Sequence, residues 1–297
     1  MLTVSCMLSA QSLNLTAQIE AKNLRIEFDH NLRSRVIKHF EEKEMPLGRF
    51  AASERVTTSR GVSAEFPFFS QILLASQAGV AANPALIEST KSEQDLAPRT
   101  DSTLPFWEDA PPVAAEFGPF GEPLPRYRTE IRSRWTDKNL YFLFVCPYEQ
   151  LNLKPSPSTS TETYRLWDWD VAEVFIGSDF RNIRRYKEFE ISPQGEWVDL
   201  DIDLTRPHHE DGWRWNSGFK VMARIDNAAK VWYAAMRIPF PALEARSPSV
   251  GDEFRVNFFR SQGPPPDRIQ IVWQPTMQKT FHVPEKFGLL RLVAMTK

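Results

Sequence analysis

The chain has 297 residues, of which 42% are hydrophobic and 25% charged, a balance typical of globular proteins and not of disordered, fibrous or membrane-embedded ones. Its 36 Lys and Arg nearly cancel 38 Asp and Glu, so nucleic acid is not an expected partner, and no apolar run approaches the ~18 residues of a membrane span. With 12 Gly, 23 Pro and two Cys, the composition also disfavours glycine-rich phosphate loops, disulfide scaffolds and sulfur-bound zinc.

The beginning of the chain allows two interpretations. Residues 1–20 hold a short apolar run that ends in small residues, as in a truncated signal peptide, which would place the protein in the periplasm or outside the cell. An unstructured or strand-forming start is an equal alternative. Residues 21–74 contain the alternating Leu24, Ile26 and Phe28 and a second short apolar element, which predict a smaller β-rich N-terminal extension.

A linker and a larger β-domain are predicted to follow. Residues 75–99 are rich in Ala, Ser, Thr and charge without a sustained period, which favours a linker. Residues 100–297 show short alternating runs separated by turns, the pattern of an all-β antiparallel β-sandwich of immunoglobulin or jelly-roll type. A hairpin is predicted at 130–145. Further strands are expected in WDWDVAEVFIG, YKEFEIS and EWVDLDIDL and at 218–225, 230–238, 253–260, 269–273 and 289–293, with one helical turn at 239–243.

Several segments match a known family in its order along the chain. They are FWEDAPPV, WTDKNLYFLFVCPYE, DWDVAEVFIG, YKEFEISPQG, WYAAMRIPFPAL, RVNFFRSQ and PEKFGLLRL. Together they resemble the carbohydrate-binding module family 9 and its DOMON-like relatives, over about the last two thirds of the chain. The resemblance implies a β-sandwich that binds sugar, often at the ends of plant-polysaccharide chains, as a glycosidase-associated, secreted module in polysaccharide degradation.

A second, looser resemblance concerns the N-terminal part. The run IEFDHNLRSRVIKHFEEKEMPLGRF is similar to the leading β-domain of α-galactosidase-like glycoside hydrolases. It implies an accessory domain of a glycosidase joined to the sugar-binding sandwich. An unrelated β-rich extension is an equal alternative.

The family resemblance also implies a binding site. Trp167 and Phe281 would clamp a sugar, because a flat aromatic ring removes the apolar C–H face of a pyranose from water. The better-studied binders have Trp where this chain has Phe281, so less stacking area is expected. Glu173, Glu190 and Gln278 would bind hydroxyls, although Glu190 replaces an Arg of the family prototype and reverses that charge. Core packing of the aromatic residues, and a solvated strand face for the glutamates, are the alternatives.

No cofactor is expected, and metal sites have weak support. Asp199, Asp201 and Asp203 alternate on one strand face and offer the hard oxygen ligands of a structural Ca²⁺. Same-face residues lie roughly 7 Å apart, so one strand cannot supply a full ligand shell, and an exposed acidic face is the favoured interpretation. His208 and His209 lack a third metal ligand at a recognisable spacing.

We therefore expect a non-catalytic protein that binds mono- or oligosaccharides, with two alternatives. A glycoside hydrolase, or an accessory part of one, would use two carboxylates between residues 168 and 190, but the chain lacks the repeated βα pattern of the usual catalytic barrel. A DOMON-like domain that binds haem or another protein is the second alternative. Haem would require Met222, Met236 or Met277 to meet His282.

Overall fold

The computed structural model describes residues 85–244 and 247–295 in full and, before them, the backbone of six short strands. The chain divides into two compact units, Met1–Ala82 and Asn83–Lys297. In the first unit, a four-stranded antiparallel sheet runs in chain order through β1 (Thr3–Leu8), β2 (Leu15–Ala21), β3 (Leu24–Phe28) and β4 (Ser34–Lys38), and β5 (Arg55–Thr57) pairs with β6 (Ser63–Glu65).

These strands can be compared with three of the predictions made from the sequence. The alternation at Leu24, Ile26 and Phe28 is confirmed as strand β3, and β4 confirms the element that follows it. Residues 1–20, considered above as a signal segment or as a strand-forming start, contain β1 and most of β2. The remainder of the predicted N-terminal extension lies outside the described residues.

The second unit is built on one twelve-stranded sheet. Its strands are β7 (Leu86–Lys91), β8 (Val113–Ala115), β9 (Thr129–Trp135), β10 (Asn139–Pro147), β11 (Val171–Gly177), β12 (Arg185–Ile191), β13 (Trp197–Asp203), β14 (Lys220–Asp226), β15 (Val231–Pro239), β16 (Glu253–Gln262), β17 (Ile269–Val272) and β18 (Gly288–Val293). Their order is β13-β12-β11-β16-β18-β7-β9-β10-β15-β14, with β17 added to β16 and β8 to β9. Pairing is antiparallel except where β7 meets β18 and β9.

Helical structure in the described part of the chain is limited to short segments of three to six residues. These are α2 (Pro105–Glu108), η1 (Pro125–Tyr127), η2 (Leu166–Asp168), η3 (His209–Arg214), η4 (Phe240–Leu243) and η5 (Pro284–Lys286). The predicted turn at 239–243 is confirmed as η4. None of the described helices is long and apolar enough to cross a membrane.

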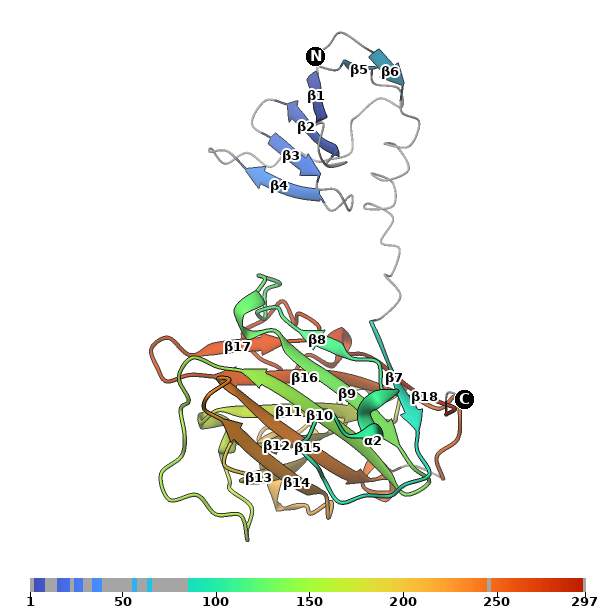
Figure 1. Cartoon of the computed structure of the whole chain (residues 1–297), viewed down its shortest axis with the longest axis vertical. Helices are drawn as coiled ribbons and strands as arrows, with labels where there is room; N and C mark the ends of the chain where they lie inside the picture. The colour runs from blue at the N-terminus through green and yellow to red at the C-terminus, as the bar shows by residue number, and fades with distance from the viewer. Residues whose placement is uncertain are drawn as a thin grey trace. The chain divides into compact units, whose positions relative to one another are not determined.

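The sheet curls so that its two halves pack on each other. In Figure 1, β9, β10 and β15 run obliquely across β11 and β16. Period-two alternation places Leu140, Phe142 and Phe144 of β10 on one fully buried face, as predicted, and Phe142 meets Phe258 of β16 with ring centroids 5.4 Å apart. Trp232 belongs to the same cluster. The predicted all-β, sandwich-type fold is therefore confirmed, and we call this cluster the interlayer core.

Strand β7 lies within the segment predicted to be a linker. It occupies the middle of the sheet, between β18 and β9. Only Ile87 adds a large apolar side chain to the interlayer core, and the strand is held by polar contacts: the hydroxyl of Ser133 donates to that of Ser89 at 2.8 Å, and Thr90 donates to the carbonyl of Asp109 at 3.0 Å. Because these side chains are polar, β7 carries no hydrophobic alternation that a sequence could show.

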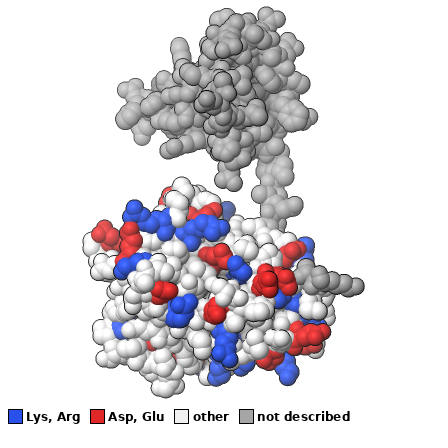
Figure 2. Space-filling view, in the orientation of Figure 1, with Lys and Arg blue, Asp and Glu red and all other residues white. Residues whose placement is uncertain are grey.

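Charge is finely mixed on the surface of the second unit. On the face seen in Figure 2, Lys and Arg alternate with Asp and Glu, and neither sign forms a broad field. Opposite charges on partly exposed side chains are also joined by salt bridges such as Arg126–Glu149 (2.5 Å) and Arg291–Glu253 (2.8 Å). A group of three acidic side chains, Glu173, Glu188 and Glu190, lies instead in a buried position.

Candidate functional site

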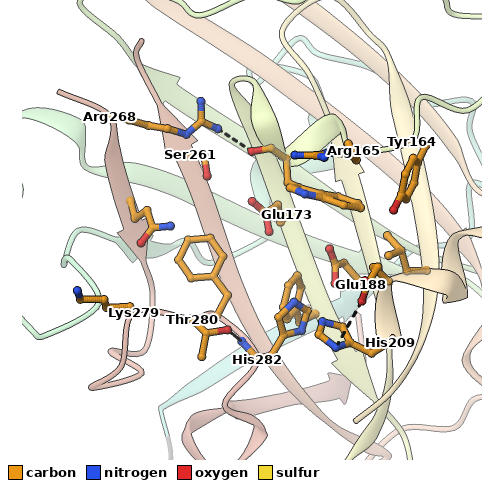
Figure 3. Close-up of a pocket in the computed structure, with 16 residues that line it drawn as sticks. Tyr164, Arg165, Glu173, Glu188, His209, Ser261, Arg268, Lys279, Thr280 and His282 are labelled. Carbon is orange, nitrogen blue, oxygen red and sulfur yellow. Dashed lines mark hydrogen bonds and ion pairs between the residues drawn. The ribbon is translucent and has the colours of Figure 1, made fainter. Parts of the chain in front are cut away.

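A pocket of about 500 Å³ opens on the face of β11, β12 and β16 that points away from the interlayer core. Figure 3 shows Glu173 and Glu188 between Arg268 and Ser261 at one end and His209 and His282 at the other. The strands form its floor, and its walls come from the η2 turn, from η3 and from the loop before η5. The lining residues are Tyr164, Arg165, Trp167, Glu173, Phe175, Glu188, Leu200, His209, Glu210, Ser261, Arg268, Gln270, Lys279, Thr280, Phe281 and His282.

The η2 turn presents Trp167 to the pocket. The side chain of Trp167 is half-buried, and its ring meets Tyr164 edge-on at 5.5 Å. The guanidinium of Arg268 donates to the backbone carbonyls of Trp167 (2.8 Å), Asp168 (3.0 Å) and Trp169. One side chain from the segment before β17 therefore fixes the turn that carries the tryptophan.

Phe281 forms part of the opposite wall. Its ring stacks on Phe259 of β16, with centroids 4.3 Å apart and planes 14° from parallel, and it is 9% exposed. Since one ring face is covered by Phe259, only the other can face a ligand. Gln278 lies outside the pocket lining: it is exposed, and its backbone carbonyl accepts a hydrogen bond from Thr276.

Three glutamates meet at the floor of the pocket. Strand register places Glu173 of β11 directly opposite Glu190 of β12, with Glu188 one step along the same face of β12. A carboxylate oxygen from each lies within 4.8 Å of the others, and the residues are only 2%, 0% and 4% exposed in the order Glu173, Glu190, Glu188. The alternative of a solvated strand face for Glu173 and Glu190 is therefore wrong.

Burial and mutual repulsion govern the protonation of this group, which we call the glutamate cluster. Burial raises the pKa of Glu173 and Glu190 well above the usual range of a carboxyl, and the neighbouring carboxylates raise it further. Burial also raises the pKa of Glu188 to about 7. Glu173 and Glu188 line the pocket directly, whereas Glu190, on the same face of β12, is fully buried and does not line it.

A histidine pair closes the other end of the pocket. Nδ1 of His282 shares a hydrogen bond of 2.6 Å with the hydroxyl of Tyr186, and its ring lies 4.4 Å from that of His209. Burial lowers the pKa of His282 to about 3, helped by the adjacent His209. The haem alternative needs a methionine beside His282, but Met236 lies in the interlayer core and Met277 is exposed; Met222 is likewise exposed on β14.

Of the carboxylates considered for the hydrolase alternative, only Glu173 and Glu190 face each other. Asp168 is exposed and pairs with Arg165 at 2.9 Å. Asp170 is buried and accepts a hydrogen bond from the N–H of Gly263 at 2.7 Å, and burial raises its pKa to about 6. The glutamate cluster is thus the one place in that segment where described carboxylates converge on the pocket.

The alternating aspartates of β13 do not form an exposed acidic face. Asp199 is fully buried and accepts a hydrogen bond from the N–H of Ser217 at 3.0 Å. Asp201 pairs with Lys187 at 2.7 Å, and Asp203 is half-buried. The expectation of exposure was wrong because Trp197 and these aspartates lie on the side of β13 facing the interlayer core, while Val198, Leu200 and Ile202 pack beneath the pocket.

Several pocket residues were not predicted from the sequence. Glu188 alternates with Glu190 in YKEFEIS, so the period of two could have shown that both lie on one strand face. Tyr164, His209 and Arg268 come from loops and turns that are distant in the chain. No sequence spacing indicates that such segments meet.

Comparisons with known proteins agree with this architecture. No family model matches the chain. Over 182 residues it is 25% identical to a protein of Arthroderma benhamiae described as an extracellular protein, covering 57% of this chain and 79% of that one.

Solved structures similar to this one include sugar-binding proteins. A carbohydrate-binding module of family 9 from Caldicellulosiruptor kristjanssonii matches in complex with cellotriose (TM-score 0.51, 13% identity, 72% of this chain and 96% of that one) and with glucose (TM-score 0.51, 12% identity, 71% and 97%). A candidate carbohydrate-binding protein from Bacteroides uniformis matches with TM-score 0.55, 15% identity, and 71% and 100% coverage. The likeness confirms the family 9-like fold of this chain. The resemblance of the N-terminal part to a glycosidase domain stays a prediction.

Proposed function

We propose that this chain is a non-catalytic carbohydrate-binding protein whose pocket holds a monosaccharide or the end of an oligosaccharide. The observation that carries the proposal is the pocket itself, which joins aromatic walls to a floor of carboxylates on the outer face of β11 and β12. Its volume of about 500 Å³ suits one or two sugar rings, since small-molecule sites commonly measure about 300–1,000 Å³. The solved neighbours in complex with cellotriose and glucose support the same ligand class.

The aromatic wall gives the ligand an apolar contact. The half-buried Trp167 provides the larger stacking surface, and Phe281 contributes the ring face that Phe259 leaves free. Aromatic stacking on the C–H face of a pyranose leaves the hydroxyl edge free for hydrogen bonds. The clamp is therefore unequal, with Trp167 as the main contact.

The polar groups of the pocket would bind the hydroxyl edge of the sugar. Glu173 and Glu188 face the pocket from its floor, and Ser261, Gln270 and Thr280 line it. Carboxylates accept charge-assisted hydrogen bonds, whereas hydroxyl and amide groups both donate and accept. Glu190 is buried beside Glu173 and Glu188, and Gln278 would reach a sugar only if that sugar extends beyond the pocket.

The biological setting belongs to the same proposal. The match to an extracellular protein of Arthroderma benhamiae supports secretion. A secreted sugar-binding chain with a family 9-like fold fits polysaccharide catabolism, with plant polysaccharide chain ends as ligands.

Calorimetric titration of the full chain with mono- and disaccharides and soluble glucans, galactans and xylans tests the proposal. We expect saturable binding without release of reducing ends. Trp167→Ala should weaken binding about 5- to 150-fold, because stacking of a ring on an aromatic side chain is worth roughly 1–3 kcal/mol. The matched control is Trp215→Ala, since Trp215 is also half-buried but packs on Phe189 at 6.3 Å, on the interlayer side.

Two results would contradict the proposed function. The first is the absence of binding to every sugar tested by a chain whose circular dichroism is that of a folded β-protein. The second is release of reducing ends by the wild-type chain that Glu173→Gln abolishes, since this would establish the glycoside hydrolase instead.

A further inference from the structure

The glutamate cluster lacks the partners that buried carboxylates normally have. One oxygen of Glu173, one of Glu188 and both of Glu190 are buried without a hydrogen-bond partner from outside the cluster. None of the ion pairs in the described part of the chain includes these residues. Arg268 acts on Glu173 through space, but its guanidinium donates to three backbone carbonyls. A buried charge without a partner is costly, so this arrangement requires a ligand or protons.

Protons alone satisfy the cluster poorly. Glu188 and Glu190 lie close enough to share a proton. A shared proton bridges only two oxygens, however, so it leaves the third carboxylate of the cluster, Glu173, without a partner. Both oxygens of Glu190 are also enclosed by the cluster and the strands, away from water. A metal ion can contact one oxygen of each carboxylate at the same time, which a single proton cannot do.

The geometry suits a hard divalent cation. The ligands are all carboxylate oxygens, which favour hard cations over Zn²⁺ or Cu²⁺, and they lie within 4.8 Å of one another, close enough for one ion to contact all three. Ca²⁺ accepts irregular geometry and several carboxylates, whereas Mg²⁺ demands a near-ideal octahedron and usually keeps several waters. Three carboxylates from two neighbouring strands therefore favour Ca²⁺.

We infer that Glu173, Glu188 and Glu190 bind a divalent cation, with Ca²⁺ preferred, at the floor of the pocket. Ca²⁺ takes about 6–8 oxygen ligands, so three glutamates leave positions for water and, where the proposed function holds, for sugar hydroxyls. That last part rests on the proposed function. The position also differs from the one considered in the sequence, since Asp199, Asp201 and Asp203 lie on the opposite face of the neighbouring strand and Asp199 and Asp201 are already partnered.

Terbium luminescence tests the site without any sugar. Tb³⁺ replaces Ca²⁺ at oxygen sites and emits when a nearby tryptophan is excited, and Trp167 lines the same pocket as Glu173. The full chain, stripped with a chelator, should show saturable Tb³⁺ emission that Ca²⁺ displaces. Calorimetry should show uptake of one Ca²⁺, and Ca²⁺ should raise the melting temperature because it binds only the folded state.

Variants locate the ion. Glu190→Gln keeps the shape of the side chain but removes a ligand charge, and it should weaken Tb³⁺ and Ca²⁺ binding on the order of 100-fold. Asp201→Asn is the matched control: it neutralises an acidic residue of the adjacent strand on the opposite face and should leave metal affinity unchanged. Near-ultraviolet circular dichroism verifies that each variant is folded.

The inference is overturned if the stripped wild-type chain gives neither Ca²⁺-displaceable emission nor heat with millimolar Ca²⁺, or if folded Glu190→Gln binds Tb³⁺ as the wild type does. Binding of glucosamine without any response to metal would also overturn it and would assign the cluster to a cationic sugar. Metal binding that depends on Glu190, together with no binding of any sugar, would support the cation and reject the proposed function. Equal sugar affinity in Ca²⁺ and in chelator would reject the contact between metal and sugar.

Discussion

Burial sets the charge of single ionisable side chains in the second unit. His282 is held neutral, since burial lowers its pKa to about 3, whereas burial raises the pKa of Asp170 to about 6. Each shift arises because a low-dielectric environment disfavours the charged form of either residue type. The two residues therefore give folding stability opposite dependences on pH, and they can be separated by substitution.

His282 should make the protein sensitive to acid. Its folded-state pKa of about 3 lies below the ordinary 6.5, so the unfolded chain binds a proton that the folded chain excludes. The stability that neutral His282 gives to the folded state is fully present above about pH 6.5, and it is lost as the pH falls toward 3. Between pH 7 and pH 5 the free energy of unfolding should drop by about 2 kcal/mol through this residue. Urea denaturation at both pH values measures the drop.

The comparison is made with His282→Asn, whose amide can still bond the hydroxyl of Tyr186 but does not titrate. His282→Asn should lose the part of the pH dependence of unfolding free energy that comes from His282. Other titrating groups, such as Asp170 with its effect of opposite sign, are present in both proteins and cancel in the comparison. Identical changes of unfolding free energy in the two proteins would show that His282 is solvated or protonated in the folded state.

At the level of elements, the pocket depends on turns that are tied to the sheet by few contacts. The η2 turn carries Trp167, and Arg268 binds the carbonyls of three successive residues of that turn. A planar guanidinium presents several donors in a fixed arrangement, which an ammonium group does not. Arg268 thus links the segment before β17 to the turn that carries Trp167, so that the position of that segment fixes the position of the Trp167 ring.

Arg268→Ala should loosen this wall more than it destabilises the fold. Because Arg268 is half-buried, we expect a loss of about 1–2 kcal/mol in unfolding free energy and, where sugar binds as proposed, an affinity about tenfold lower through poorer positioning of Trp167. Calorimetry and urea denaturation measure the two effects. Arg224→Ala is the control, since Arg224 forms a partly exposed pair with Asp226 at 3.7 Å on β14. Equal losses of affinity in both variants would contradict the positioning role.

The sequence predicted the individual strands better than it predicted which strands and loops lie next to one another. Period-two alternation located the hairpin of β9 and β10 and the buried face of Leu140, Phe142 and Phe144, because hydrophobic burial leaves a local pattern. The pairing of Glu173 with Glu190 depends on the register of β11 against β12, and the meeting of Arg268 with η2 depends on tertiary contacts. Such non-local contacts leave no period in the chain, so only the family resemblance placed Glu173 and Glu190 in one site, and the approach of the three carboxylates was not predicted.

At the scale of the whole molecule, the second unit closes through β7. This strand joins β18 to β9; without it β18 would end as an edge, and β8 alone would remain paired along that side of β9. The residues that follow it also hold the β9–β10 hairpin: a carboxylate oxygen of Asp95 accepts hydrogen bonds from Thr136 at 2.9 Å, Asn139 at 2.7 Å and Tyr141 at 2.7 Å. The segment expected to be a linker thus completes the sheet.

Two truncations should therefore behave in opposite ways. A chain of residues 83–297 keeps β7, the interlayer core and the pocket, and it should unfold cooperatively and bind the same ligands as the full chain. A chain of residues 100–297, the domain expected from the sequence, loses β7 with Ile87 and Asp95, and it exposes the edge of β18 and the end of β9 at Arg134 and Trp135. Loss of a central strand removes contacts comparable to the whole stability of a domain, about 5–15 kcal/mol, so this chain should aggregate or lack a cooperative transition. Calorimetric melting and size-exclusion chromatography compare the two, and a stable, monomeric 100–297 chain would show that β7 is dispensable and that the sheet closes without it.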